Sequence, residues 1–124
     1  MATSKIRNPI PGLVAGASFA SAQYKVVKFA STAVQVIPVT SSTDVALGII
    51  QDDPTTGQPA LIAGPGDVAI AIAGVADLAQ GERVGWNTTG QVDDTKARKI
   101  GIALKPSTAV GDYVPVLLIG YQAA

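Results

Sequence analysis

Two pairs of adjacent carboxylates, Asp52-Asp53 and Asp93-Asp94, are the only acidic pairs in the sequence. General acid–base catalysis needs two carboxylates that converge on a substrate, whereas adjacent strand residues point to opposite faces. Both pairs lie in turn-like sequence, where an Asp side chain accepts hydrogen bonds from the nearby backbone. Neither follows the spaced Asp-x-Asp-x-Asp-Gly pattern of a calcium loop. We therefore interpret both pairs as turn residues and expect no bound metal.

The sequence is also poor in nucleophiles and bases. It contains no Cys and no His, which excludes thiol nucleophiles, Cys/His zinc sites and His-based triads. The glycine-containing stretches at 64–66 and 81–83 lack the Lys-Ser/Thr of a phosphate-binding loop. Residues 87–89 form a glycosylation sequon, which matters only in a secreted chain. We expect neither enzymatic activity nor a cofactor.

The charge balance excludes two classes of partner. Nine basic residues match nine acidic ones, so the net charge is zero. Nucleic-acid binding and attachment to an anionic membrane both require a surplus of Lys and Arg, so we expect neither. The longest apolar run, 68–76, is also too short for a membrane helix, and we expect synthesis in the cytoplasm. Low net charge in a chain that is 48% hydrophobic favours apolar contact with a partner, including further copies of the chain.

Secondary-structure patterns predict an all-β fold with less than about 10% helix, because no segment repeats apolar residues at the helical spacing. A chain of 124 residues fits one domain, which we expect to be a small β-barrel or β-sandwich. Runs rich in Val, Ile and Tyr alternate with Gly, Pro, Ser and Asp clusters. The expected strands are 24–30, 34–40, 46–51, 68–77, 83–87, 99–105 and 112–119.

The N-terminal segment, residues 1–22, reads as an extended arm that precedes a single β domain, residues 23–124. Pro9, Pro11, Gly12 and Gly16 oppose a regular helix and weaken a strand. Two readings remain open: a frayed terminus, or a segment that becomes ordered on another protein. In the second reading the candidate contact residues are Lys5, Ile6, Arg7, Ile10, Leu13, Val14 and Phe19.

Three short motifs occur twice and indicate an internal repeat. Val27-x-Phe29 is similar to Val84-x-Trp86, and Leu-Gly-Ile at 47–49 is similar to Ile-Gly-Ile at 100–102. Gly-Asp followed by an apolar residue occurs at 66–68 and 111–113. Such a repeat predicts two similar three-stranded halves that close into one barrel or sandwich.

The strand at 68–73 alternates large and small apolar residues, so that its alanines share one face. A face of alanines allows another layer to approach closely, and that layer is the arm, another sheet of the chain or a neighbouring subunit. The candidate subunit-interface residues are Ala69, Ala71, Ala73 and Trp86. Pro38 and Pro115 lie inside strand runs, which predicts that those strands are edges or contain bulges.

Two segments, ASAQYKVVKF at 20–29 and ALGIIQDDP at 46–54, resemble the capsid decoration (cement) proteins of tailed bacteriophages. The resemblance spans about residues 17–120 and departs at 58–66, where the loop is longer. Further matching pieces are 74–75, 81–84 and 100–104.

This resemblance implies a non-enzymatic β protein that binds the exterior of an expanded icosahedral head and clamps neighbouring major capsid subunits against the pressure of packaged DNA. The implied partners are the major capsid protein and further copies of the chain, as a homotrimer at three-fold positions. The implied location is the outer surface of the virion capsid, reached after synthesis in the host cytoplasm. Two alternatives are another β-structured virion component, such as a tail-tube or head-fibre base, and a small carbohydrate-binding module.

Overall fold

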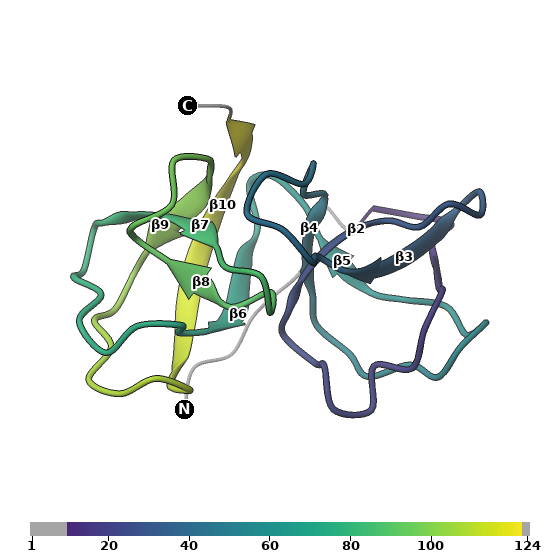
Figure 1. Cartoon of the computed structure of the whole chain (residues 1–124), viewed down its shortest axis with the longest axis horizontal. Helices are drawn as coiled ribbons and strands as arrows, with labels where there is room; N and C mark the ends of the chain where they lie inside the picture. The colour runs from purple at the N-terminus through teal and green to yellow at the C-terminus, as the bar shows by residue number, and fades with distance from the viewer. Residues whose placement is uncertain (1–9, 123–124) are drawn as a thin grey trace.

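Ten β-strands and no helix make up residues 10–122, the part of the chain that this computed structural model describes (Figure 1). The prediction of an all-β fold is therefore confirmed for these residues. The strands are β1 (Val14–Ala15), β2 (Val26–Phe29), β3 (Gln35–Pro38), β4 (Gly48–Ile50), β5 (Ile62–Ala63), β6 (Val68–Ile72), β7 (Arg83–Trp86), β8 (Val92–Asp93), β9 (Lys99–Ala103) and β10 (Tyr113–Gln122).

The strands form two five-stranded sheets that lie side by side (Figure 1). Sheet A has the order β1-β3-β2-β4-β5 and sheet B the order β6-β10-β9-β7-β8. Neighbouring strands are antiparallel, except that β1 runs parallel to β3. A bridge between Ala73, just after β6, and Val92 in β8 brings the two ends of sheet B together. Sheet B therefore curls into a half-barrel.

Alternate residues of sheet A enter two different hydrophobic clusters. Val26, Ile49 and Ala63 belong to the larger cluster, which lies between the two sheets. The residues beside them, including Val27 and Ile50, belong to the second cluster on the opposite face of sheet A. Because both faces are buried here, β4 and β5 contain no polar residue, and β2 begins with two consecutive buried valines.

The segment at 10–22 supplies the cover for that second face. It is extended, as predicted, but Leu13 and Phe19 are buried in the second cluster. The N–H of Ile10 donates to the Ile62 carbonyl at 3.1 Å, and Val14 pairs with Gln35. The predicted arm over residues 1–22 is therefore wrong from Ile10 onward, since this part belongs to the β domain. Leu13 and Phe19 are core residues and not contact residues, because the chain itself covers them.

The remaining predicted arm residues fall into two groups. Ile10 and Val14 are half-buried, and Ile10 packs against the second cluster. Lys5, Ile6 and Arg7 lie outside the described residues.

Strand register confirms the predicted internal repeat. Val27 pairs with Gly48 in sheet A, and the equivalent residues Val84 and Gly101 pair in sheet B. The third pair of similar segments forms β6 and β10, which run antiparallel to each other with Ile70 opposite Pro115 at the centre. Equivalent strands that pair about a common midpoint are related by a local two-fold rotation.

The two halves differ in how they support this central pair of strands. In the second half, the N–H of Leu104 donates to the Pro115 carbonyl at 2.9 Å. At the equivalent position of the first half, the Gln51 side chain makes the corresponding hydrogen bonds to β6. Its Nε2 donates to the Ile70 carbonyl at 3.0 Å, and its Oε1 accepts from the Ile70 N–H at 3.0 Å. The Gln51 amide thus imitates a neighbouring strand and connects β4 to β6.

Neither β3 nor β10 is an edge strand. The alternative prediction, a bulge, agrees with β10, because its pairing with β9 shifts register between Leu118 and Gln122. Pro115 lies in β10, between β6 and β9. Pro115 is tolerated there because its missing N–H would face β9, and the β9 ladder begins only at the Val116–Ala103 pair. Pro38 lies in β3, beyond the two residues that pair with β1. Both prolines therefore stand where no partner strand needs their N–H.

Candidate functional site

The alanine face of β6 lies in the core. Ala69, Ala71 and Ala73 are fully buried within the single chain and belong to the cluster between the sheets, while Val68 and Ile72 on the opposite face are half-buried. The prediction that these alanines form a subunit interface is therefore wrong. They are small because sheet A and the side chains of the half-barrel occupy the space in front of them.

The prediction that Trp86 belongs to a subunit interface is wrong for the same reason. Its side chain is fully buried in the same cluster, and its Nε1 donates to the Ser41 carbonyl at 3.0 Å. A buried indole cannot contact a second subunit, nor can it act as a stacking surface for a sugar. Trp86 instead anchors the interior of the half-barrel to the loop between β3 and β4.

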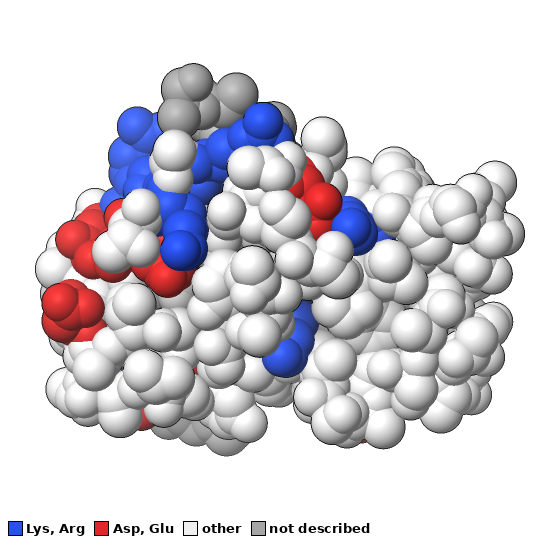
Figure 2. Space-filling view, viewed as in Figure 1, with Lys and Arg blue, Asp and Glu red and all other residues white. Residues whose placement is uncertain are grey.

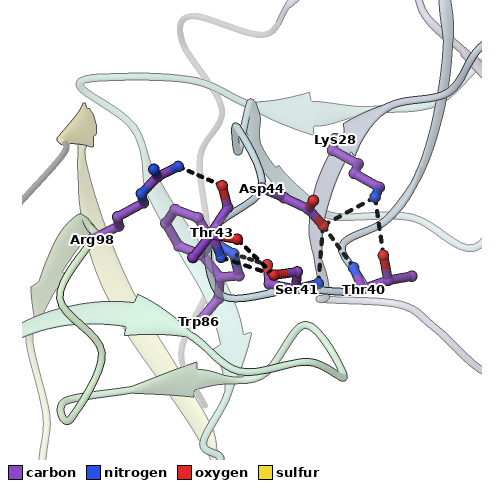
Figure 3. A network of polar contacts seen from close by, with 7 residues as sticks. All are labelled: Lys28, Thr40, Ser41, Thr43, Asp44, Trp86 and Arg98. Carbon is purple, nitrogen blue, oxygen red and sulfur yellow. Dashed lines mark hydrogen bonds and ion pairs between the residues drawn. The ribbon is translucent and has the colours of Figure 1, made fainter.

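That loop connects the two halves of the molecule (Figure 3). Besides Ser41, the carbonyl of Thr43 accepts a hydrogen bond from the guanidinium of Arg98 in the other half. Inside the loop, Asp44 accepts hydrogen bonds from the N–H groups of Thr40 and Ser41 at 2.9 and 3.0 Å. The arrangement fixes the loop conformation, and we assign it a structural role.

Asp44 also pairs with Lys28, whose Nζ lies 3.0 Å from Oδ2. Burial raises the pKa of Asp44, but the hydrogen bond from Thr40, the contact with Lys28 and the hydrogen bond from Ser41 outweigh it and hold this pKa below its ordinary value. The N–H groups of Thr108 and Ala109 similarly lower the pKa of Asp112. Two loops of the molecule therefore depend on an ionised Asp.

We expect the stability of the protein to fall as the pH drops below about 4, in part through Asp44. The folded state has the lower pKa, so the unfolded state binds the proton first and is favoured as the pH decreases. Asp44→Asn should lower the melting temperature at pH 7 and lose its effect at about pH 2. Lys28→Gln should lower the melting temperature less, because the N–H groups of Thr40 and Ser41 still donate to Asp44. A side-chain NMR titration of Asp44 with a midpoint above 4 would contradict this account.

The contacts of Asp93 agree with the predicted turn role, because its side chain accepts hydrogen bonds from the N–H and hydroxyl of Thr95 at 2.8 and 2.6 Å. Asp52 instead accepts a hydrogen bond from the N–H of Leu61, nine residues further along the chain. In the sequon, Asn87 Oδ1 accepts hydrogen bonds from Thr89 and Gln91 and so closes a turn. These polar side chains stabilise the local backbone.

Asp94 lies beside further acidic groups. Burial, a hydrogen bond to Glu82 and the charges of Glu82 and Asp77 raise the pKa of Asp94. Across residues 10–122, however, no group of three acidic side chains is arranged to hold a metal ion.

Charge is distributed unevenly over the surface. On the face drawn in Figure 2, Lys, Arg, Asp and Glu gather over the half that contains sheet B, whereas little charge is visible over the half that contains sheet A. The sequence from residue 29 to residue 43 contains no charged residue. The two charges that flank this stretch, Lys28 and Asp44, neutralise each other. The segment from residue 29 to residue 43 therefore presents no net charge.

Several large apolar side chains are exposed. Among the described residues, those with more than half of their surface exposed are Phe29, Val34, Val45, Val110 and Tyr113. Tyr113 packs edge-to-face on Tyr24, with 5.4 Å between ring centroids. Sequence reasoning did not find these residues, because each belongs to an ordinary strand or loop pattern. For Phe29 and Val34 alone, the sequence offered one signal, the charge-free stretch at 29–43.

The chain matches no protein-family model and no curated protein. None of the described residues belongs to a helix that could span a bilayer. The most distinctive surface feature of the described residues is the set of exposed apolar side chains on a chain with no net charge.

Proposed function

We propose that this chain is a structural virion protein that binds the outer surface of an icosahedral phage head and reinforces the contacts between major capsid subunits. The observation that carries the proposal is a set of five apolar side chains, each more than half exposed, on a chain with a net charge of zero. Such a surface favours binding to a partner over the free monomeric state. Icosahedral repetition turns many modest interfaces into a large total stabilisation.

The resemblance to decoration proteins supports the same proposal. Its two main segments, 20–29 and 46–54, contain β2 and β4, which pair directly through Val27 and Gly48. The similar residues therefore form one continuous part of sheet A and are not scattered matches. The partners are then the major capsid protein and, in a homotrimer at three-fold positions, further copies of this chain.

The test is binding to heads that lack the protein. Heads would be purified from a phage whose copy of this gene is deleted, mixed with the purified chain and sedimented. We expect co-sedimentation that saturates at a fixed number of copies per shell, and decorated heads that withstand a higher temperature before they release DNA. Heads that already carry the protein serve as the control and should bind no more. Failure to co-sediment, or recovery of the chain in tails only, would overturn the proposal.

A further inference from the structure

The connection between β2 and β3, here called the hairpin tip and comprising residues 29–34, lies at the end of the molecule opposite sheet B (Figure 1). Phe29 is 53% exposed and Val34 is 57% exposed. Neither belongs to the two buried clusters of the described residues. The tip therefore presents two large apolar side chains to solvent.

Val34 also has a strained backbone. Its φ is +57°, in the left-handed region, where a β-branched residue is a genuine outlier. Its carbonyl accepts a hydrogen bond from the Val14 N–H at 3.0 Å, which holds the residue in this conformation. Glycine or asparagine would adopt the same conformation at lower cost and would not expose a valine side chain.

Tyr24 provides an instructive comparison. It is the other non-glycine residue with positive φ among the described residues, at +68°. Its ring packs on Tyr113, so its conformation is compensated by a contact inside the chain. Val34 combines a strained backbone with a side chain that is more than half exposed. Backbone strain of this kind is concentrated at functional sites.

We propose that the hairpin tip is the anchor that seats this protein on the capsid, with Phe29 and Val34 inserted into an apolar, uncharged hollow of a major capsid subunit. This inference rests on the proposed function, which supplies the partner. The chemistry of the hollow follows from the tip itself, because residues 29–43 carry no charge and the flanking Lys28 and Asp44 neutralise each other. Binding through the tip should therefore depend on apolar contact and not on ion pairs.

The decisive variant is Val34→Asn, which removes the apolar side chain and suits the left-handed conformation. We expect it to melt at the same temperature as the unmodified chain or higher, and to bind undecorated heads about tenfold more weakly or worse. Phe29→Ser should weaken binding in the same way. Val110→Asn is the matched control, because Val110 is 61% exposed but lies in the other half of the molecule, and its binding should be unchanged.

The outcomes separate the two proposals. If the unmodified chain does not bind heads, the proposed function fails. If it binds and Val34→Asn binds equally well, or Val110→Asn weakens binding as much, the anchor proposal alone is overturned. A lower melting temperature for Val34→Asn would also overturn it, since Val34 would then stabilise the fold. Binding by the unmodified chain should change less than about twofold between about 0.05 and 0.5 M NaCl, and a strong salt dependence would point to the charged half instead.

Discussion

Replacing Ala71 with Arg is expected to unfold the protein. Ala71 is fully buried in the centre of β6 and faces the cluster between the two sheets. An arginine there would place an unpaired charge and a long side chain in a close-packed interior, at a cost of about 3–5 kcal/mol or more. This is a large part of the stability of a small domain. Far-UV circular dichroism and thermal melting would show the loss of the β fold.

Ala109→Arg is the control for this experiment, because Ala109 is exposed in the loop before β10. It should melt within a few degrees of the unmodified chain, because such a surface change is expected to alter the free energy of unfolding by about half a kcal/mol or less. An Ala71→Arg chain that folds and melts normally would contradict the burial of the alanine face. That result would restore the reading of this face as a contact surface between subunits.

The substitutions Gly48→Ala and Gly101→Ala should each destabilise the protein by about 3 kcal/mol. A Cβ atom on Gly48 would lie 2.0 Å from the Ala63 carbonyl oxygen, and one on Gly101 would lie 2.5 Å from the Leu117 carbonyl oxygen. Both obstacles are backbone atoms of paired strands, so the strands would have to separate to make room. Urea denaturation would measure the loss as a lower midpoint.

Gly16→Ala is the matched control for these two variants. A Cβ atom on Gly16 would meet only the side chains of Gln35 and Ile37, at 3.1–3.2 Å. Side chains adjust more easily than a strand backbone, so we expect Gly16→Ala to lower the free energy of unfolding by less than about 1 kcal/mol. Equal losses at Gly16 and Gly48 would show that the close approach of the strands is not what requires glycine.

These glycines also give a physical reason for the repeated motif of the sequence. The motif Leu-Gly-Ile at 47–49 and its repeat at 100–102 place a glycine at equivalent positions in β4 and β9. Each glycine stands where an adjacent strand leaves no space for a side chain. The motif therefore reflects the packing of strands in each half. Under the proposed function, contacts with the capsid would be made by exposed residues, such as those of the hairpin tip, and not by this motif.

Local features of the fold could be predicted because they depend on neighbouring residues. Runs rich in Val, Ile and Tyr between clusters of turn residues predicted seven of the ten strands, and the repeated motifs predicted the equivalent pairs in the two sheets. The strands β1, β5 and β8 were missed because each has only two residues, too few to form a pattern. They exist because a longer strand beside each offers hydrogen-bonding groups.

The sequence by itself determined which residues of each strand share a face, since alternation follows from backbone geometry. Only the tertiary structure decided which face is inside. The alanines of β6 face inward because sheet A lies against them, and the segment at 10–22 is buried because sheet A has a second apolar face to cover. The exposure of Phe29 and Val34 was decided in the same way, since the segment at 10–22 reaches the hairpin tip through the Val14–Val34 hydrogen bond but leaves both side chains more than half exposed. Burial depends on contacts between residues far apart in the sequence, and no local pattern encodes them.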